Sequence, residues 1–185
     1  MDRLFEPGLC LVDAPRNAAR RLFQTLAHRA VHRDPHGHVL WCDGDHGFDP
    51  YDFAEENLVR GFAADEGADR VLVKRCMTPF QWDAVLTKHL SQKLSTTRTS
   101  LVLVLPFDAL FSTEELADWE QVDYVTYGLS HLSGLAARHA VPILLGVDLR
   151  RWSATLPELA AIARQAVARQ EVLGRTLSAD SRKGA

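Results

Sequence analysis

The sequence has little of what marks a secreted, membrane-spanning or disulfide-built protein. Its 185 residues include only three cysteines, Cys10, Cys42 and Cys76. Such a small, odd number of widely spaced thiols argues against a disulfide framework and is typical of a reducing cytoplasm. No apolar run approaches the roughly 20 residues of a membrane span, and the first residues lack the apolar core of a secretion signal. We therefore expect a cytoplasmic protein with no membrane partner.

The chain also lacks a strong charge of one sign. Its formal net charge is -3, so no overall attraction toward nucleic acid or anionic membranes is expected. Hydrophobic residues make up 46% and charged residues 24%, which is the balance of a globular domain with a sizeable core. The length predicts one domain over residues 1–177, and the polar residues 178–185 predict a disordered tail.

Short, continuously apolar runs alternate with helical patterns along the chain. Strands are expected at residues 9–12, 39–42, 71–74, 100–105 and 141–145, because such runs are typical of strands buried on both faces. Helices are expected at residues 18–31, 51–61, 78–89, 120–140 and 156–172. The alternation predicts an α/β fold with a doubly wound, mostly parallel sheet.

The loop after the first strand, the usual phosphate cradle of such folds, lacks what a phosphate needs. A P-loop reads G-x-x-x-x-G-K-[ST], whereas residues 14–21 read APRNAARR, with Asn17 among them. Ala14 and Ala19 stand where glycines let the backbone wrap a phosphate. Arg20 stands where a lysine would reach the phosphates, and Arg21 stands where a hydroxyl would bind Mg²⁺. Taken alone, this segment is an ordinary strand–helix turn with exposed arginines.

Four further segments resemble parts of the RecA/RadA strand-exchange ATPase family. Residues 39–51 (VLWCDGDHGFDPY) are similar to the family's second strand and the loop that enters its helix. Residues 71–81 are similar to its next strand and Arg-x-x-x-x-x-Gln helix start, and residues 101–115 to its Walker B strand. Residues 129–145 are similar to its long helix and the Val-rich strand that follows. Their order and spacing agree, so the resemblance implies a RecA-like P-loop NTPase fold.

The functional prediction depends on the positions at which the sequence departs from the family pattern. Leu105 stands where the Walker B acid would orient Mg²⁺ and its water. The family's polar sensor pair falls on residues 146–148 (GVD), which do not keep the pattern. Asp45 matches the family's catalytic glutamate, but one acid cannot run phosphoryl transfer without a phosphate cradle and a metal site. The resemblance with these losses predicts a pseudo-ATPase with no cofactor and no metal, in which Asp45 is a remnant or a structural loop acid.

The C-terminal part of the sequence indicates that the protein binds a partner. Family members continue past the fifth strand with further strands, so we expect a C-terminally truncated sheet with an edge strand that needs a cover. The family assembles side by side through such surfaces, which implies a dimer of this chain or a complex with a recombinase or another RecA-like paralogue. The predicted function is a non-catalytic, protein-binding accessory in DNA recombination or repair, and it rests on family analogy.

Two alternatives remain open at this point. One is direct DNA binding through an arginine-rich edge, because loops after parallel strands meet at one edge of the sheet. The residues in question are Arg16, Arg20, Arg21, Arg150 and Arg151, with Trp152 as a stacking surface for a base or a partner. Scattered surface arginines and a packed tryptophan are the simpler interpretation. The other alternative is an enzyme with an unrelated nucleotide or metal site.

Histidines, cysteines and acidic residues are the remaining candidates for functional residues. His28 and His32 share a helix face at i, i+4, and Cys42 and Asp43 follow, which is one pattern for zinc. No CxxC or HExxH spacing supports it, and a solvated helix end is the simpler interpretation. The three cysteines are interpreted as core residues. An acidic run over residues 114–123 stands where the family has a DNA-binding loop, and it disfavours a phosphate backbone there.

Overall fold

The computed structural model describes residues 2–107, 116–155, 157–158, 161–162 and 169–172. The strands are β1 (Gly8–Asp13), β2 (His38–Asp43), β3 (Val71–Arg75), β4 (Thr99–Leu105), β5 (Pro142–Val147) and β6 (Arg169–Val172). The α-helices are α1 (Arg16–Arg33), α2 (Pro50–Val59), α3 (Pro79–Ala84), α4 (Ser91–Thr96), α5 (Asp118–His139) and α6 (Leu149–Thr155). Three shorter elements are the 3-10 helices η1 (Asp2–Phe5) and η2 (Ala68–Arg70) and the π-helix η3 (Val85–Leu90).

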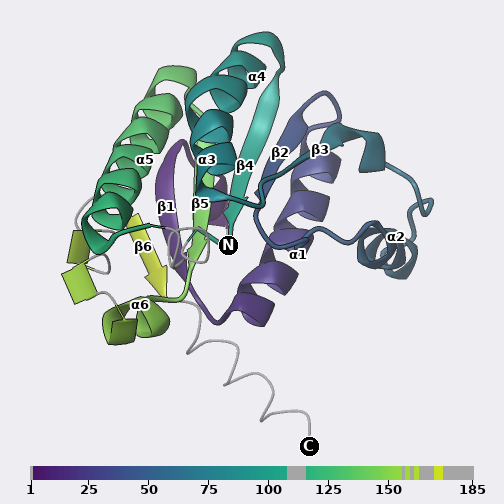
Figure 1. Ribbon diagram of the computed structural model, residues 1–185. Coiled ribbons are helices and arrows are strands. Elements are labelled where there is room, and N and C mark those ends of the chain that lie inside the picture. The colour runs from purple at the N-terminus through teal and green to yellow at the C-terminus, as the bar shows by residue number, and fades with distance from the viewer. Residues whose placement is uncertain (1, 108–115, 156, 159–160, 163–168, 173–185) are drawn as a thin grey trace, which may run out of the picture.

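The strands form one parallel sheet in the order β3-β2-β4-β5-β1-β6. Since β4 and β5 lie between β2 and β1, the order is neither the 3-2-1-4-5-6 of Rossmann folds nor the 2-1-3-4-5 of flavodoxin-like folds. The carboxyl ends of β1, β5, β4 and β2 therefore lie side by side along one edge of the sheet (Figure 1).

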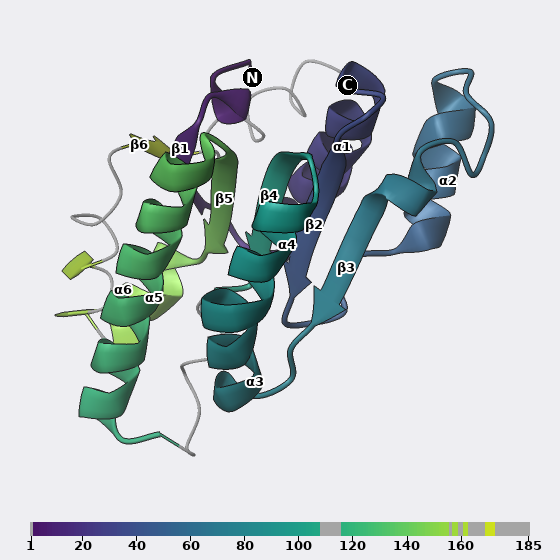
Figure 2. The same cartoon turned by 90° about the horizontal axis from the view of Figure 1, so that it is seen from above.

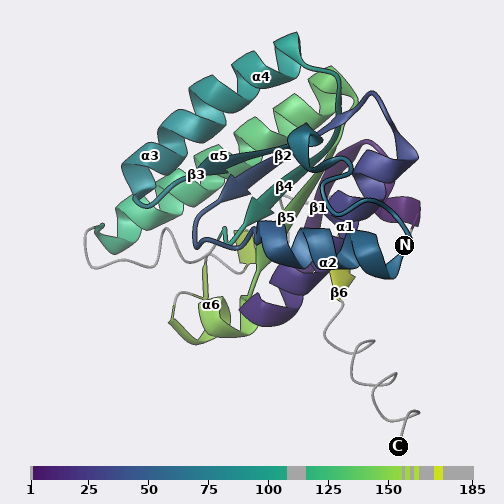
Figure 3. The same cartoon turned by 90° about the vertical axis from the view of Figure 1, so that its right-hand side faces the viewer.

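Helices cover both faces of the sheet, which confirms the predicted doubly wound architecture (Figure 2). One face carries α1, on which α2 packs, and the other carries the continuous helix α3-η3-α4 and α5 (Figure 3). Side chains alternate accordingly: Cys10 and Val12 pack toward α1, whereas Leu9 and Leu11 pack toward α5. Among the described residues, no helix combines the length and the apolarity that crossing a bilayer requires.

The start of α2 has a side-chain cap, and the start of α1 does not. The Asp49 carboxylate accepts a hydrogen bond from the backbone N–H of Tyr51 at 2.8 Å at the start of α2. Before α5, Glu120 accepts one from the N–H of Ala117 at 2.8 Å. By contrast, α1 has no side-chain cap and no acid in its first turn. Its positive helix end and its first arginines must therefore find negative groups elsewhere in the fold.

Three sequence expectations are wrong. The helix expected at residues 78–89 continues through η3 to Thr96. The helix expected at residues 156–172 does not cover its last residues, because Arg169–Val172 form β6. The sheet does not stop at five strands, since β6 pairs with β1 on the side opposite β5. A four-residue strand that reads RQEV has no apolar run, so only its pairing with β1 reveals it. The expected tail at residues 178–185 lies outside the described residues.

Candidate functional site

The loops after β1 and β5 are hydrogen-bonded to each other at the carboxyl edge of the sheet. The backbone N–H of Ala14 donates to the carbonyl of Val147 at 3.0 Å, and that of Leu149 donates to Asp13 Oδ1 at 3.0 Å. This confirms that the two loops share one edge. Ala14 is 3% exposed and Ala19 is 1% exposed. Their methyl groups therefore pack into the core at the positions where glycines would leave room for a phosphate.

Two arginines at the start of α1 bind the loop after β2. Arg16 Nε donates to Asp45 Oδ2, and the Arg16 side chain is 50% exposed whereas that of Asp45 is 4% exposed. Arg20 donates through Nη2 to the carbonyl of His46 at 2.6 Å. His46 has a positive φ of 59°, which turns its carbonyl into this tight loop. The guanidinium of Arg16 thus neutralises the one acid that matched a catalytic residue.

Asp43 organises this loop, and sequence reasoning missed its role. It is fully buried at the end of β2, and its carboxylate accepts hydrogen bonds from the N–H groups of Asp45, Gly47 and Phe48 at 2.7–3.3 Å. Arg75 Nε lies 3.8 Å from Asp43 Oδ2. Several donors converging on one carboxylate fix the loop that presents Asp45. The available signal was an aspartate followed by a glycine-containing turn, which is typical of side chains that bond their own backbone.

Leu105, which the family resemblance aligns with the Walker B acid, is a core residue. It is 1% exposed at the end of β4, and a Cβ built on Gly146 of β5 would overlap its Cδ1 atom. The leucine therefore occupies space that the absent side chain of Gly146 leaves open. Phe107, two residues beyond, is fully buried. The end of β4 is thus apolar among the described residues, and it offers no oxygen ligand for a metal at residue 105.

Trp152 is a packed tryptophan, as the simpler interpretation expected, and the alternative of a stacking surface is wrong. Its side chain is fully buried, and its ring meets the edge of Phe107 with centroids 6.1 Å apart. The reason is that α6 folds back against the sheet on the side of α5, so that Leu149 and Trp152 join that core (Figure 3). A tryptophan in this position contributes apolar packing and presents no face to a base.

The expected patch of five arginines is divided between two helices. Arg150 and Arg151 are exposed on α6, which packs on the α5 side of the sheet. Arg16 and Arg20 belong to α1 on the other side and bind the loop after β2. Asn17 and Arg21 are exposed on α1. At least two of the five arginines therefore already have partners within the fold.

The cysteines are core residues, as expected. Cys10, Cys42 and Cys76 are all free and buried. Burial raises the pKa of the Cys76 thiol to about 12, and it raises the pKa of the Cys42 thiol further, with the neighbouring Cys76 as a second cause. Both thiols are therefore protonated at neutral pH and are poor nucleophiles.

The residues of the zinc hypothesis are not brought together. The rings of His28 and His32 lie with centroids 4.4 Å apart on α1. Cys42, however, packs in the core on the opposite face of the sheet, and Asp43 holds the loop after β2. Within the described ranges, no three histidine, cysteine, aspartate or glutamate side chains are grouped closely enough to hold a metal ion.

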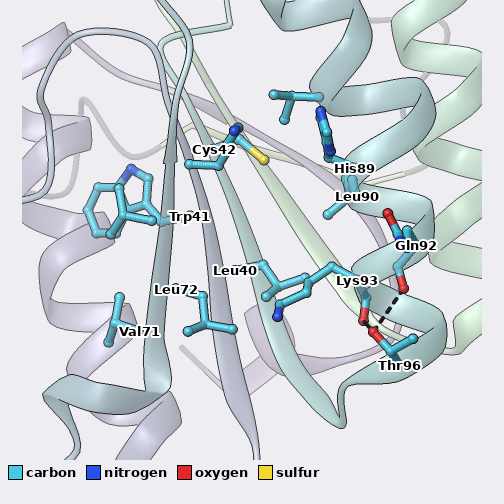
Figure 4. A pocket seen from close by; sticks show the side chains of 13 residues that line it. Leu40, Trp41, Cys42, Val71, Leu72, His89, Leu90, Gln92, Lys93 and Thr96 are labelled. Atoms are coloured by element: carbon cyan, nitrogen blue, oxygen red, sulfur yellow. Dashed lines mark hydrogen bonds between the residues drawn. The ribbon is translucent and has the colours of Figure 1, made fainter.

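A groove of about 570 Å³ lies beside the edge strand β3 (Figure 4). Leu40, Cys42 and Leu72 line it from the sheet, and the helix α3-η3-α4 lines it with Val85, His89, Leu90, Gln92, Lys93 and Thr96. The helix wall includes η3, and π-helical turns are frequent at functional sites. β3 pairs with β2 on one side only. Sequence reasoning did not find this groove, because its residues lie on segments far apart in the chain.

Comparison of the chain with models of known protein families finds no match, and comparison with curated proteins finds no similar protein. The geometry gives two features to explain. At the carboxyl edge, Arg16 and Asp45 form an internal ion pair, and Ala14, Ala19 and Leu105 are buried. At the β3 edge, a strand with one neighbour borders an apolar groove.

Proposed function

We propose that this chain is a non-catalytic RecA/RadA-like paralogue that acts as a protein-interaction subunit or accessory in DNA recombination and repair. The observation that supports the loss of catalysis is the ion pair between Arg16 and Asp45. It joins the loop after β1 to the loop after β2, where the resemblance expects a phosphate cradle and a water-activating acid. The cytoplasm is the proposed location, since three buried free thiols suit a reducing compartment.

Electrostatics at this edge opposes the chemistry of ATP hydrolysis. A base that activates water needs a free oxygen near the attacking water. Asp45 Oδ2 accepts a hydrogen bond from Arg16, and Oδ1, which has no hydrogen-bond partner among the described residues, is buried from solvent. A Mg²⁺ ion placed beside Asp45 would face that guanidinium as a like charge. Leu105 has no oxygen to bind the metal or its water. The hydrogen bond to Asp45 removes the base, the guanidinium of Arg16 repels the metal ion, and Leu105 removes a metal ligand. Phosphoryl transfer needs each of these groups.

Partner binding is proposed at the groove beside β3. An edge strand presents unpaired backbone N–H and C=O groups, and an extended segment of another chain can add to it. Leu72 of β3 is only partly buried and lines the groove next to that edge. A partner segment would pair with β3 and place its apolar side chains against Leu72. The proposed partner is a recombinase or another RecA-like paralogue, or a second copy of this chain.

The loss of catalysis is tested by an ATP hydrolysis assay with Mg²⁺ on the full chain. The expected result is no release of phosphate above the buffer rate. The matched variant is Asp45→Asn, which keeps the size of the side chain and removes its charge. Hydrolysis by the native chain that disappears in Asp45→Asn would overturn the proposal, because it would make Asp45 a working base.

The interaction role is tested by affinity capture from the native host, combined with light scattering. The native chain is expected to recover a RecA-like protein or to form a dimer. Leu72→Asp is expected to lose that association, because it places a charge against the β3 groove. The matched control is Leu58→Asp on α2, where the leucine is 62% exposed and outside the groove. A strictly monomeric chain that captures no RecA-like protein, or equal capture by both variants, contradicts the proposal.

A further inference from the structure

The segment that forms β3 and the helix α3-η3-α4 carries a positive charge that the chain as a whole does not have. Residues 71–98 contain five lysines and arginines and one acid, whereas the formal net charge of the chain is -3. Both arginines of the segment pair with carboxylates of the fold. Its lysines, Lys74, Lys88 and Lys93, form no ion pair with a described residue. These lysines can therefore bind an anionic group of another molecule.

Two of these lysines line the groove beside β3. Lys74 of β3 and Lys93 of α4 are exposed there, together with His89 of η3. Among the described residues, no aspartate or glutamate lines the groove. Figure 4 shows His89 and Lys93 on the helix wall, opposite the apolar side chains of the sheet. The groove thus combines an apolar floor with a basic rim.

The strand period of β3 places an apolar and a basic side chain on the same face. Leu72 and Lys74 are two residues apart, and both line the groove. Val71 and Val73 belong to the opposite face and pack toward α1. A strand that adds to β3 therefore places one side chain beside Leu72 and another, two positions away, beside Lys74. An apolar side chain suits the first position, and an acidic one suits the second.

The apolar floor of the groove favours a protein segment over a nucleic acid. A single strand binds through its phosphates and through aromatic surfaces on which its bases stack. The tryptophan in the lining, Trp41, is fully buried, and the sheet side of the groove offers Leu40, Cys42 and Leu72. A phosphate backbone would use the lysines and leave these apolar side chains uncovered. A segment with apolar and acidic residues uses both the floor and the rim.

We propose that the groove binds an extended protein segment that carries an apolar residue and an acidic residue two positions apart. The apolar side chain packs against Leu72, and the carboxylate binds Lys74, with Lys93 as a second cation of the same groove. This inference rests on the partner binding at β3 proposed above, and it adds the chemistry by which the partner is recognised. Opposite charges across an interface select among partners, so a segment with a lysine in place of the acid is rejected.

The test is a selection of short random peptides, displayed on phage, for binding to the full chain. Peptides with an apolar and an acidic residue two positions apart are expected to be enriched, in either order, because the added strand can run in either direction. Apolar and acidic residues at adjacent positions are the internal reference, since their side chains lie on opposite faces of a strand. Absence of enrichment over this reference overturns the proposal.

Charge reversal in the groove tests the role of the two lysines. An enriched peptide is expected to bind Lys74→Glu combined with Lys93→Glu about tenfold more weakly than the native chain, as measured by fluorescence anisotropy. The matched control is Lys88→Glu combined with Arg138→Glu, which reverses two exposed charges outside the groove and is expected to bind like the native chain. Circular dichroism checks that both double variants fold. Equal binding by the two double variants overturns the proposal.

The failure of this inference and the failure of the proposed function give different results. Selection of the expected peptides without capture of a RecA-like protein from the host contradicts the role in recombination and supports the groove chemistry. Capture of a RecA-like protein that Lys74→Glu combined with Lys93→Glu does not weaken supports the role and overturns this inference. Binding of a fluorescent oligothymidylate that these substitutions abolish, without peptide enrichment, assigns the basic rim to nucleic acid and also overturns it.

Discussion

The two ends of α1 carry arginines in opposite situations. At the first turn, Arg16 and Arg20 bind a carboxylate and a carbonyl of the loop after β2. At the last turn, the guanidinium of Arg33 lies 5.3 Å from the centroid of the Phe5 ring. The helix dipole disfavours cations at the first turn and favours them at the last. The first arginines therefore need negative groups from elsewhere in the fold, whereas the helix end itself favours Arg33.

The comparison teaches that an arginine count does not locate an anion site. Arg16 lies in the segment that the family resemblance aligns with a P-loop, yet its charge is already neutralised by Asp45. What decides is whether the fold supplies an internal partner for the charge. If Arg16, Arg20 and the loop after β2 form a structural clamp, substitutions at the two ends of α1 must change stability by different amounts. Loss of Arg16 must destabilise the chain, whereas loss of the exposed Arg33 must change its stability little.

The largest effect on stability is expected at Leu105, which is buried at the carboxyl end of β4. Leu105→Ala should lower the free energy of unfolding by about 2–5 kcal/mol, because the fully buried side chain leaves a cavity. Gly146→Ala should lower it by about 1–3 kcal/mol, because the new Cβ overlaps Leu105. Urea unfolding monitored by circular dichroism measures both changes.

The double variant sharpens this prediction. An alanine at residue 146 extends into the space that Leu105→Ala vacates. The double variant should therefore lose less unfolding free energy than the sum of the losses of the two single variants. A coupling of at least about 0.5 kcal/mol is expected for residues in contact. Leu132→Ala combined with Gly146→Ala is the control, since Leu132 packs in the core on the α5 face, whereas Leu105 packs on the α1 face. Additive losses at residues 105 and 146 would contradict the packing described here.

The second effect is a difference between the stability losses caused by replacing Arg16 and by replacing Asp45. Arg16→Met leaves the nearly buried carboxylate of Asp45 without its cation, and should lower the free energy of unfolding by about 3 kcal/mol. Asp45→Asn leaves a half-exposed guanidinium that water can solvate, and should lower it by only about 1 kcal/mol. The different exposures of the two side chains, 50% and 4%, set this order.

Chemical denaturation of the two single variants and the double variant measures the asymmetry. Arg21→Met is the matched control, because Arg21 is exposed in the same helix turn and should change stability by less than about 0.5 kcal/mol. An effect of Asp45→Asn larger than that of Arg16→Met would show that Asp45 has a further cation as partner, and the clamp as described would be wrong.

Much of the fold is predictable from the sequence, for a simple reason. The five interior and edge strands from β1 to β5 include short apolar runs, and a buried parallel sheet requires such runs. β6 has no such run, and its four residues, three of them polar, become a strand only through pairing with β1. The extension of the helix after residue 89 was missed for a similar reason, since the π-helical turn η3 shifts the helical period in the middle of the element.

The site is less predictable, because sequence shows residue types and not their partners. The residues 14–21 indicated a lost phosphate cradle, and the burial of Ala14 and Ala19 agrees with that interpretation. That Arg16 would bind Asp45 depends on how the loops after β1 and β2 meet, 29 residues apart in the chain. For Trp152, the flanking arginines left a stacking surface open as an alternative, whereas its burial confirms the simpler interpretation of a packed tryptophan.

The smallest effect is a pH dependence at the other end of α1. Burial lowers the pKa of His28 in the folded chain below its ordinary value of 6.5. The folded state then binds fewer protons than the unfolded state, so stability rises with pH across that window. This contribution is complete above pH 6.5 and is lost as pH falls below it. His28→Phe removes the titrating ring and with it this contribution.

The measurement is the difference in unfolding free energy between His28→Phe and the native chain at pH 7.5, 6.5 and 5.5. The difference should grow as pH falls, because only the native chain loses stability by protonating His28. Other titrating groups, including His32, Glu56 and Glu66 around the ring, remain in both chains and largely cancel. A difference that stays constant over this range would mean that His28 has the same proton affinity folded and unfolded. The hydrogen bond to the Asn57 side chain, which raises the pKa of His28, would then offset the effect of burial.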